Sequence, residues 1–110
     1  MKAINLKTEK REELIDITSQ VNEAVTSSKV RKGICLVYVP HTTSGVIINE
    51  NADPSVKKDI LMALKNIAPD SLPYTHYEGN SPSHIKASLV GSSINVIIED
   101  GHLELGTWQG

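Results

Sequence analysis

The residues of this sequence that can do chemistry are gathered in three polar clusters, each beside an apolar stretch. The first cluster consists of His41, Thr42, Thr43, Ser44 and Gly45. Its imidazole, its hydroxyls and the backbone N–H groups of a glycine-permitted turn can together bind an anion. The same composition is common in turns whose hydroxyls satisfy only their own backbone, so the sequence leaves both interpretations open and favours the structural one.

The second cluster runs from Asn49 to Asp53 and is rich in oxygen donors. Asp53 stands before Pro54 and is expected to cap the helix that follows, a position that Asp favours. Asn49 and Glu50 have no such structural task. Oxygen donors of this density suit Mg²⁺, but their spacing does not identify a dedicated cation site.

The third cluster contains two of the four histidines. It consists of His76, Glu78, Asn80, His84 and Lys86. We expect His84 and Lys86 in the first turn of a helix, where free N–H groups and the helix dipole favour phosphate or carboxylate. His76 and His84 could also join His41 in an open Zn²⁺ site, although the spacing matches no known zinc motif and a lone surface histidine is usually only solvated.

The composition excludes several classes of partner. With 11 basic and 13 acidic residues the formal charge is −2, and aromatic residues make up only 4% of the chain. Such a chain lacks the basic field that attracts nucleic acid or anionic membranes, and it lacks the rings on which single-stranded bases stack. No stretch approaches the roughly 20 apolar residues of a membrane span. We therefore expect no nucleic acid and no membrane partner.

The single cysteine excludes an internal disulfide and is typical of a reducing compartment. Cys35 lies in the most apolar stretch and is expected to be a buried small hydrophobic residue rather than a nucleophile. The charged N-terminal residues show no signal-peptide pattern. These features predict a cytoplasmic protein, and 110 residues fit a single domain.

The first polar cluster must be positioned by elements in the N-terminal half. Loose alternation of apolar residues predicts a hairpin from strands 2–8 and 12–17. Either Thr18 or Ser19 is expected to cap a helix, whose buried face would be Val21, Ala24 and Val25. Buried strands are predicted at 33–39 and 46–48, on either side of the histidine turn.

The other two clusters flank a second predicted helix. That helix is capped by Asp53, has Pro54 in its first position, and repeats apolar residues every three or four positions, at Val56, Ile60, Leu64 and Ile67. Residues 68–83 form a long irregular loop of the kind that is usually functional or disordered. A short helix over Ser83–Val90, ended by Gly91, should follow it.

The C-terminal part predicts a β-hairpin. Alternation over Ser93–Glu99 indicates a strand, and Asp100-Gly101 is typical of a type I′ turn leading into a partner strand over 102–108. The whole order of elements predicts an α+β domain with largely antiparallel β-sheets.

The polar motifs resemble those of the YjbQ-like family over essentially the whole chain. They occur in the family's order as His41-Thr-Thr-Ser-Gly45, Ile48-Asn-Glu-Asn-Ala-Asp-Pro54, Glu78-Gly-Asn-Ser81, His84-Ile-Lys86, Ser93 before a strand, and Gly106-Thr-Trp-Gln109. The resemblance implies antiparallel sheets packed with about two or three helices and assembly as a homotrimer. It also implies that residues 1–110 form one YjbQ-like domain without about one or two of the family's C-terminal strands, which would cover a sheet edge.

The resemblance further implies a pocket lined by the three clusters, holding anions and a divalent metal, with Zn²⁺ expected and Mg²⁺ as the alternative. Members are commonly described as secondary thiamine-phosphate synthases, which couple hydroxymethylpyrimidine diphosphate to thiazole phosphate and release pyrophosphate. Such a reaction needs cations and donors at the departing diphosphate and negative charge at the pyrimidine cation. The catalytic residues implied are His41, Glu50, Asp53 and Lys86, and the anion-binding residues are Thr42, Thr43, Ser44, Asn49, Glu78, Asn80 and Lys86.

Two non-catalytic interpretations remain open. The same side chains could bind a small phosphorylated metabolite in a trimeric module with no catalysis. Alternatively, the polar loops could serve only to stabilise the subunit interfaces of a trimeric interaction protein. A melting-temperature shift on adding phosphate ligands would distinguish the first from the second, because a ligand that binds only the folded state stabilises it.

Overall fold

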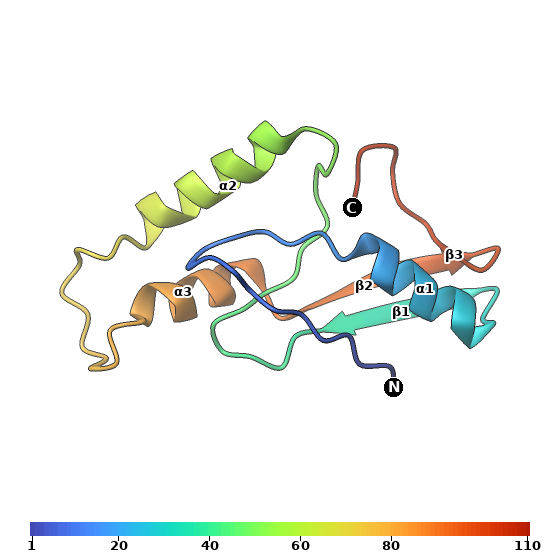
Figure 1. Ribbon diagram of the computed structural model, residues 1–110, viewed down its shortest axis with the longest axis horizontal. Coiled ribbons are helices and arrows are strands. Elements are labelled where there is room, and N and C mark those ends of the chain that lie inside the picture. Colours follow the sequence, from blue (N-terminus) through green and yellow to red (C-terminus); the bar gives the residue numbers. More distant parts are fainter.

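The computed structural model describes residues 1–110 and has the predicted α+β architecture (Figure 1). Its elements are α1 (Thr18–Ser28), β1 (Gly33–Tyr38), α2 (Pro54–Ile67), α3 (Ser81–Val90), β2 (Ser93–Glu99) and β3 (His102–Leu103). The molecule is elongated, with dimensions of 50 × 29 × 22 Å. No helix is long and apolar enough to cross a membrane.

The three strands form one antiparallel sheet in the order β1-β2-β3. The turn between β2 and β3 is confirmed, with φ of 49° at Asp100 and 79° at Gly101, both in the left-handed region that a type I′ turn requires. The last strand is much shorter than predicted, because the chain leaves the sheet after Leu103. Residues 108–110 instead pair with the second polar cluster, through a bridge between Glu50 and Gln109.

One sheet face and α1 provide four of the six buried hydrophobic side chains. Val21 and Val25 of α1 are 6% and 4% exposed, and Val96 and Ile98 of β2 are 6% and 5% exposed. Helix α1 lies beside β3 (Figure 1), and Asn22 Oδ1 accepts a hydrogen bond from the Leu103 N–H at 3.2 Å. The predicted inner face of α1 is therefore confirmed at its two valines.

The opposite sheet face is apolar and exposed. Ile34, Leu36 and Tyr38 of β1 are 70%, 63% and 62% exposed, and Ile97, which lies opposite Ile34 in the register, is 60% exposed. Cys35 alternates with these residues and is half-buried. Burial raises the pKa of the Cys35 thiol, which keeps it in the neutral form and supports its prediction as a hydrophobic residue.

Helix α2 begins as predicted. Asp53 Oδ1 accepts from the Ser55 N–H at 2.9 Å, and Pro54 occupies the first helical position. The apolar stripe of α2 is only half-buried, and Ile67 at its end is 60% exposed. Figure 1 shows why: α2 stands away from the sheet, so its inner face meets little of the chain.

Three predicted strands, at 2–8, 12–17 and 46–48, are absent from the structure. Residues 1–17 form neither a helix nor a strand, and none of the backbone–backbone hydrogen bonds involves residues 1–16. The alternation in this segment is too loose to fix a register. Residues 46–48 also form no strand, because Val46, although buried, makes a single backbone bond, from its N–H to the Gly91 carbonyl at 3.0 Å.

Both remaining helices begin differently from the prediction. Neither Thr18 nor Ser19 caps α1; Ile17 occupies the cap position, and Asp16 accepts from the Thr18 N–H at 2.9 Å. Helix α3 begins at Ser81, two residues before the predicted Ser83, because Asn80 takes the cap position and Pro82 suits the first turn.

Candidate functional site

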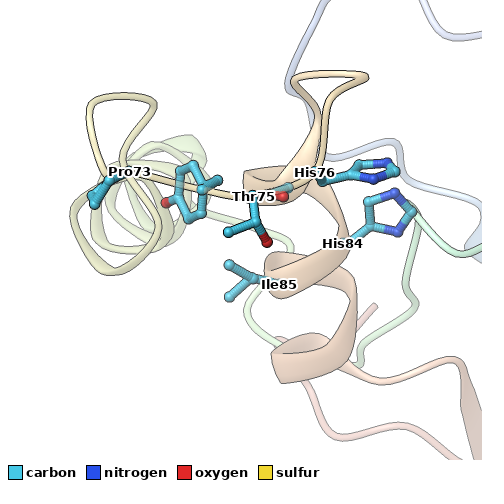
Figure 2. Close-up of a pocket in the computed structure, with 7 residues that line it drawn as sticks. Pro73, Thr75, His76, His84 and Ile85 are labelled. Atoms are coloured by element: carbon cyan, nitrogen blue, oxygen red, sulfur yellow. The ribbon is translucent and has the colours of Figure 1, made fainter.

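A shallow depression lies where the long loop after α2 meets the first turn of α3. Its volume is about 470 Å³. The residues that line it are Pro73, Tyr74, Thr75, His76, Ser81, His84 and Ile85 (Figure 2). The loop that was expected to be functional from its length thus contributes one wall, and α3 contributes the other.

The two histidines of the third cluster lie together at one end of this depression. The rings of His76 and His84 are edge to face, with centroids 5.3 Å apart and planes at 83° (Figure 2). His84 is fixed by the first turn of α3. His76 is fixed by a tight turn, in which the Gly79 N–H donates to the His76 carbonyl at 3.2 Å and Gly79 has φ of 77°.

The loop and the start of α3 supply further polar groups in this region. Glu78 Oε2 lies 4.0 Å from His76 Nε2, close enough to attract the ring when it is protonated. The hydroxyls of Thr75 and Ser81 line the same depression. Asn80, at the cap of α3, has a buried Oδ1 without a hydrogen-bond partner. Imidazoles, hydroxyls and a helix start are a donor set that suits a phosphate group.

The first cluster stays at the surface. His41, Thr42, Thr43 and Ser44 are all exposed, and their side chains make no hydrogen bond and do not line the depression. The turn passes the C-terminal end of α3, where a Cβ on Gly45 would lie 2.7 Å from the Gly91 carbonyl oxygen. Glycine is therefore needed here for close packing, and the polar side chains before it remain free.

The second cluster has structural partners that the sequence did not reveal. The Asn49 N–H donates to the Gly110 carbonyl at 3.1 Å, and the Asn51 N–H donates to the Trp108 carbonyl at 2.8 Å. Asn49 Oδ1 accepts from the Glu50 N–H at 2.7 Å. The backbone hydrogen bond from Ser55 to Asp53 lowers the pKa of that carboxyl, as expected of a helix cap.

Lys86 is placed differently from the prediction. Because α3 begins at Ser81, Lys86 lies in its second turn, and its ammonium pairs with the Glu12 carboxylate. Its side chain is 15% exposed and does not line the depression. Residues two apart on a helix point in different directions, so the turn that directs His84 at His76 directs Lys86 elsewhere.

Comparison with known proteins assigns the family. Residues 2–110 match the family described as UPF0047 protein YjbQ-like. This chain belongs to the YjbQ-like family.

The relatives of this YjbQ-like chain come from both archaea and bacteria. It is 58% identical over 105 residues to a UPF0047 protein of Methanocaldococcus jannaschii, which covers 96% of this chain and 76% of that protein. It is 48% identical over 111 residues to UPF0047 protein YugU of Bacillus subtilis, covering 100% of this chain and 84% of that protein.

Solved structures of the YjbQ-like family confirm the fold. The crystal structure of an uncharacterized conserved YjbQ/UPF0047 protein from Clostridium acetobutylicum has a TM-score of 0.93 at 55% identity. The match covers 96% of this chain and 81% of that one. A YbjQ-like protein of unknown function from Sulfolobus solfataricus gives 0.90 at 33% identity, covering 94% and 76%.

The structure provides only part of a ligand set for the divalent metal that we expected this YjbQ-like chain to bind. His76 and His84 provide imidazole nitrogens, which suit Zn²⁺ better than Mg²⁺. No group of at least three His, Cys, Asp or Glu side chains is placed to hold a metal ion. The structure therefore brings together two of the three predicted zinc ligands and leaves His41 outside the group.

Sequence reasoning missed several residues of the depression, namely Pro73, Tyr74, Thr75, Ser81 and Ile85. Tyr74 is held by a hydrogen bond from its hydroxyl to the Pro69 carbonyl at 2.6 Å. The only signal for them was their position in a long loop and at the start of the helix after it.

Proposed function

We propose that this chain binds a small phosphorylated metabolite in the depression between the loop before α3 and the first turn of α3. The observation that carries the proposal is the His76–His84 pair, with ring centroids 5.3 Å apart, in a depression that Thr75 and Ser81 also line. Phosphate oxygens accept hydrogen bonds from all of these groups. Figure 2 gives the arrangement: the rings stand at one end and Pro73 and Ile85 offer an apolar surface for the rest of the ligand.

Zn²⁺ is the metal that fits the proposal best. Two imidazoles form an incomplete site, and zinc in proteins takes at least three protein ligands. His41, with the exposed hydroxyls of Thr42, Thr43 and Ser44 beside it, is the donor that would complete the site. A bound Zn²⁺ would supply positive charge for phosphate oxygens.

A homotrimer is the assembly that we propose for this site. Its support is the exposed apolar sheet face of Ile34, Leu36, Tyr38 and Ile97. Only seven of 110 residues are buried in the isolated chain, and a soluble cytoplasmic protein gains stability by covering such a face. Association of subunits would also bring a polar cluster of one subunit close to a polar cluster of its neighbour, so that both could contact the same phosphorylated ligand.

Thiamine-phosphate synthase activity is the catalytic form of this proposal. Hydroxymethylpyrimidine diphosphate and thiazole phosphate both carry phosphate, the group that the depression suits. Glu50 is half-buried and its side chain makes no hydrogen bond, so its carboxylate is available to stabilise the pyrimidine cation. Asp53 is engaged as a helix cap and Lys86 as the partner of Glu12, so His41 and Glu50 are the stronger catalytic candidates.

Genetic complementation tests the catalytic form. We expect expression of the chain to restore growth without thiamine in a bacterial strain that lacks its main thiamine-phosphate synthase, and His84→Ala to fail at equal protein level. If the wild-type chain, well expressed, does not restore growth, the synthase proposal is wrong. Phosphate-metabolite binding is in that case judged separately, by calorimetric titration.

A further inference from the structure

The N-terminal segment, residues 1–16, crosses the molecule without joining any helix or strand (Figure 1). No backbone–backbone hydrogen bond involves these residues. A segment with so little backbone pairing must be held in place by its side chains. The contacts of those side chains therefore decide where the segment lies.

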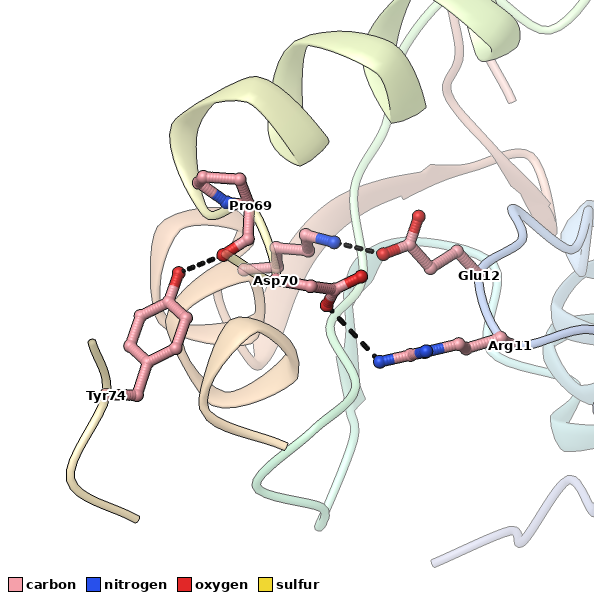
Figure 3. A network of polar contacts seen from close by, with 6 residues as sticks. Arg11, Glu12, Pro69, Asp70 and Tyr74 are labelled. Carbon is pink, nitrogen blue, oxygen red and sulfur yellow. Dashed lines mark hydrogen bonds and ion pairs between the residues drawn. The ribbon is translucent and has the colours of Figure 1, made fainter. Parts of the chain in front are cut away.

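Two neighbouring residues of this segment each make an ion pair, Arg11 as the cation and Glu12 as the anion (Figure 3). Arg11 Nη2 lies 3.2 Å from Asp70 Oδ1, in the loop after α2. Glu12 pairs with the Lys86 ammonium, on α3. The second pair is the more sheltered, with side chains 33% and 15% exposed, against 77% and 55% for Arg11 and Asp70.

The two anchor points belong to the two elements that form the walls of the depression, although neither Asp70 nor Lys86 lines it. Asp70 belongs to the loop that continues through Pro73 to His76, and the Tyr74 hydroxyl bonds the Pro69 carbonyl within that loop. Lys86 belongs to α3, two residues after His84. The segment thus connects the loop after α2 to α3 through its two ion pairs (Figure 3), and the same loop and helix carry His76 and His84.

We propose that Arg11 and Glu12 are positioning residues: they clamp the loop after α2 to α3 and so keep His76 and His84 at the separation that ligand binding needs. The ligand-binding part of this inference rests on the proposed function. Glu12 is the main anchor, because an ion pair that is partly shielded from water is screened less than the exposed pair of Arg11. Glu12 is also the partner of the Lys86 ammonium, which does not line the depression.

Charge reversal of the Glu12–Lys86 pair tests the clamp. The variants are Glu12→Gln, Glu12→Lys, Lys86→Glu and the double swap Glu12→Lys/Lys86→Glu. Glu99→Gln is the matched control, since it breaks the Lys32–Glu99 pair, 3.3 Å long and at the far end of the sheet. Two quantities are measured: the nuclear Overhauser effect between the rings of His76 and His84, and the affinity for inorganic pyrophosphate by calorimetry.

We expect Glu12→Gln and each single reversal to weaken the ring-to-ring signal and to lower pyrophosphate affinity by about threefold to tenfold, the usual size of coupling between contacting residues. The double swap should restore both, and Glu99→Gln should change neither. A general loss of stability would not be repaired by the swap, so recovery identifies the pair itself.

The inference is overturned if Glu12→Gln keeps the ring-to-ring signal and binds pyrophosphate within about twofold of the wild-type affinity. Such a change is smaller than contacting residues usually show. The same holds if a folded double swap fails to recover. If Lys86→Glu does not fold, the comparison of Glu12→Gln with Glu99→Gln, in ring-to-ring signal and pyrophosphate affinity, decides whether the clamp exists. If the wild-type chain binds no pyrophosphate, the proposed function loses support, while the ring-to-ring signal still decides whether the clamp exists.

Discussion

The Asn51 side-chain amide donates a hydrogen bond to Asp16 Oδ2 at 2.8 Å, across 35 positions of sequence. The other oxygen of Asp16 accepts from both the N–H and the hydroxyl of Thr18, at 2.9 and 2.7 Å. One carboxylate therefore ties the start of α1 to the second polar cluster. The hydrogen bonds from Thr18, followed by that from Asn51, lower the pKa of Asp16 to about 2.

This lowered pKa predicts how stability depends on pH. A carboxyl whose pKa falls from its ordinary 3.8 to about 2 on folding stabilises the folded state at pH above the ordinary value. That stabilisation is lost as the pH falls through the range between the two values. Because Asp16 is exposed, we expect only about 1 kcal/mol after allowing for screening.

The measurement is the free energy of unfolding in urea of wild type and Asp16→Asn, from about pH 6 down to about pH 2. The two proteins should differ at the higher pH and converge at the lower. Asp59→Asn is the control, since Asp59 is exposed on α2 and its side chain makes no ion pair. A constant difference across the whole range would show that Asp16 acts through packing and not through its charge.

The close approach of Gly45 to α3 predicts a large cost for a small substitution. In Gly45→Ala the new Cβ would meet the Gly91 carbonyl oxygen and Val90 Cγ1, each at 2.7 Å. We expect a loss of about 1–3 kcal/mol in the free energy of unfolding, since the backbone must move to relieve the contact. In Gly33→Ala the nearest atom is Val30 Cγ1 at 3.4 Å, so that variant should lose much less. Equal losses in chemical denaturation would contradict this account.

The exposed sheet face predicts how the proposed homotrimer can be broken. Leu36 lies between Ile34 and Tyr38 on this face and is 63% exposed. A lysine there would put a charge into an apolar interface, so Leu36→Lys should sediment as a folded monomer where the wild type sediments as a trimer. Leu72→Lys, at an exposed apolar residue outside the sheet, should remain trimeric. A trimeric Leu36→Lys would show that this face is not the interface.

The elements that were predicted correctly are those defined by neighbours in sequence. Strand β2 has the bounds read from its alternation, Ser93–Glu99, and the start of α2 follows from Asp53 and Pro54. The turn at Asp100-Gly101 needs only two residues with positive φ. Such signals act over a few residues and do not depend on how the rest of the chain packs.

The wrong predictions concern segments whose structure depends on contacts with residues far away in the sequence. The N-terminal segment alternates loosely, yet its position is set by partners far along the chain, such as Lys86, which lies 74 positions from Glu12. The same contact removes Lys86 from the predicted anion site. Asn49 was predicted to bind an anion, but the C-terminal residues pair with the backbone of Asn49 and of Asn51. No local pattern in the sequence carries this information.

The candidate site was predicted in part. His76, Glu78, Asn80 and His84 were predicted as site residues, and the structure places the two histidines, but not Glu78 or Asn80, in the lining of one depression. Thr75, Ser81 and the apolar wall were missed, because hydroxyl and apolar residues are common in any loop or helix. The third expected ligand, His41, does not join the other two within the chain.

The central claim is that the His76–His84 depression binds a phosphorylated metabolite, and calorimetric titration with thiamine monophosphate tests it most directly. We predict saturable binding by the wild type and by His102→Ala, whose histidine lies in the β2–β3 hairpin, and a loss of about tenfold or more in His84→Ala. Equal affinity in all three proteins, or no binding by the folded wild type with or without Zn²⁺, would contradict the claim.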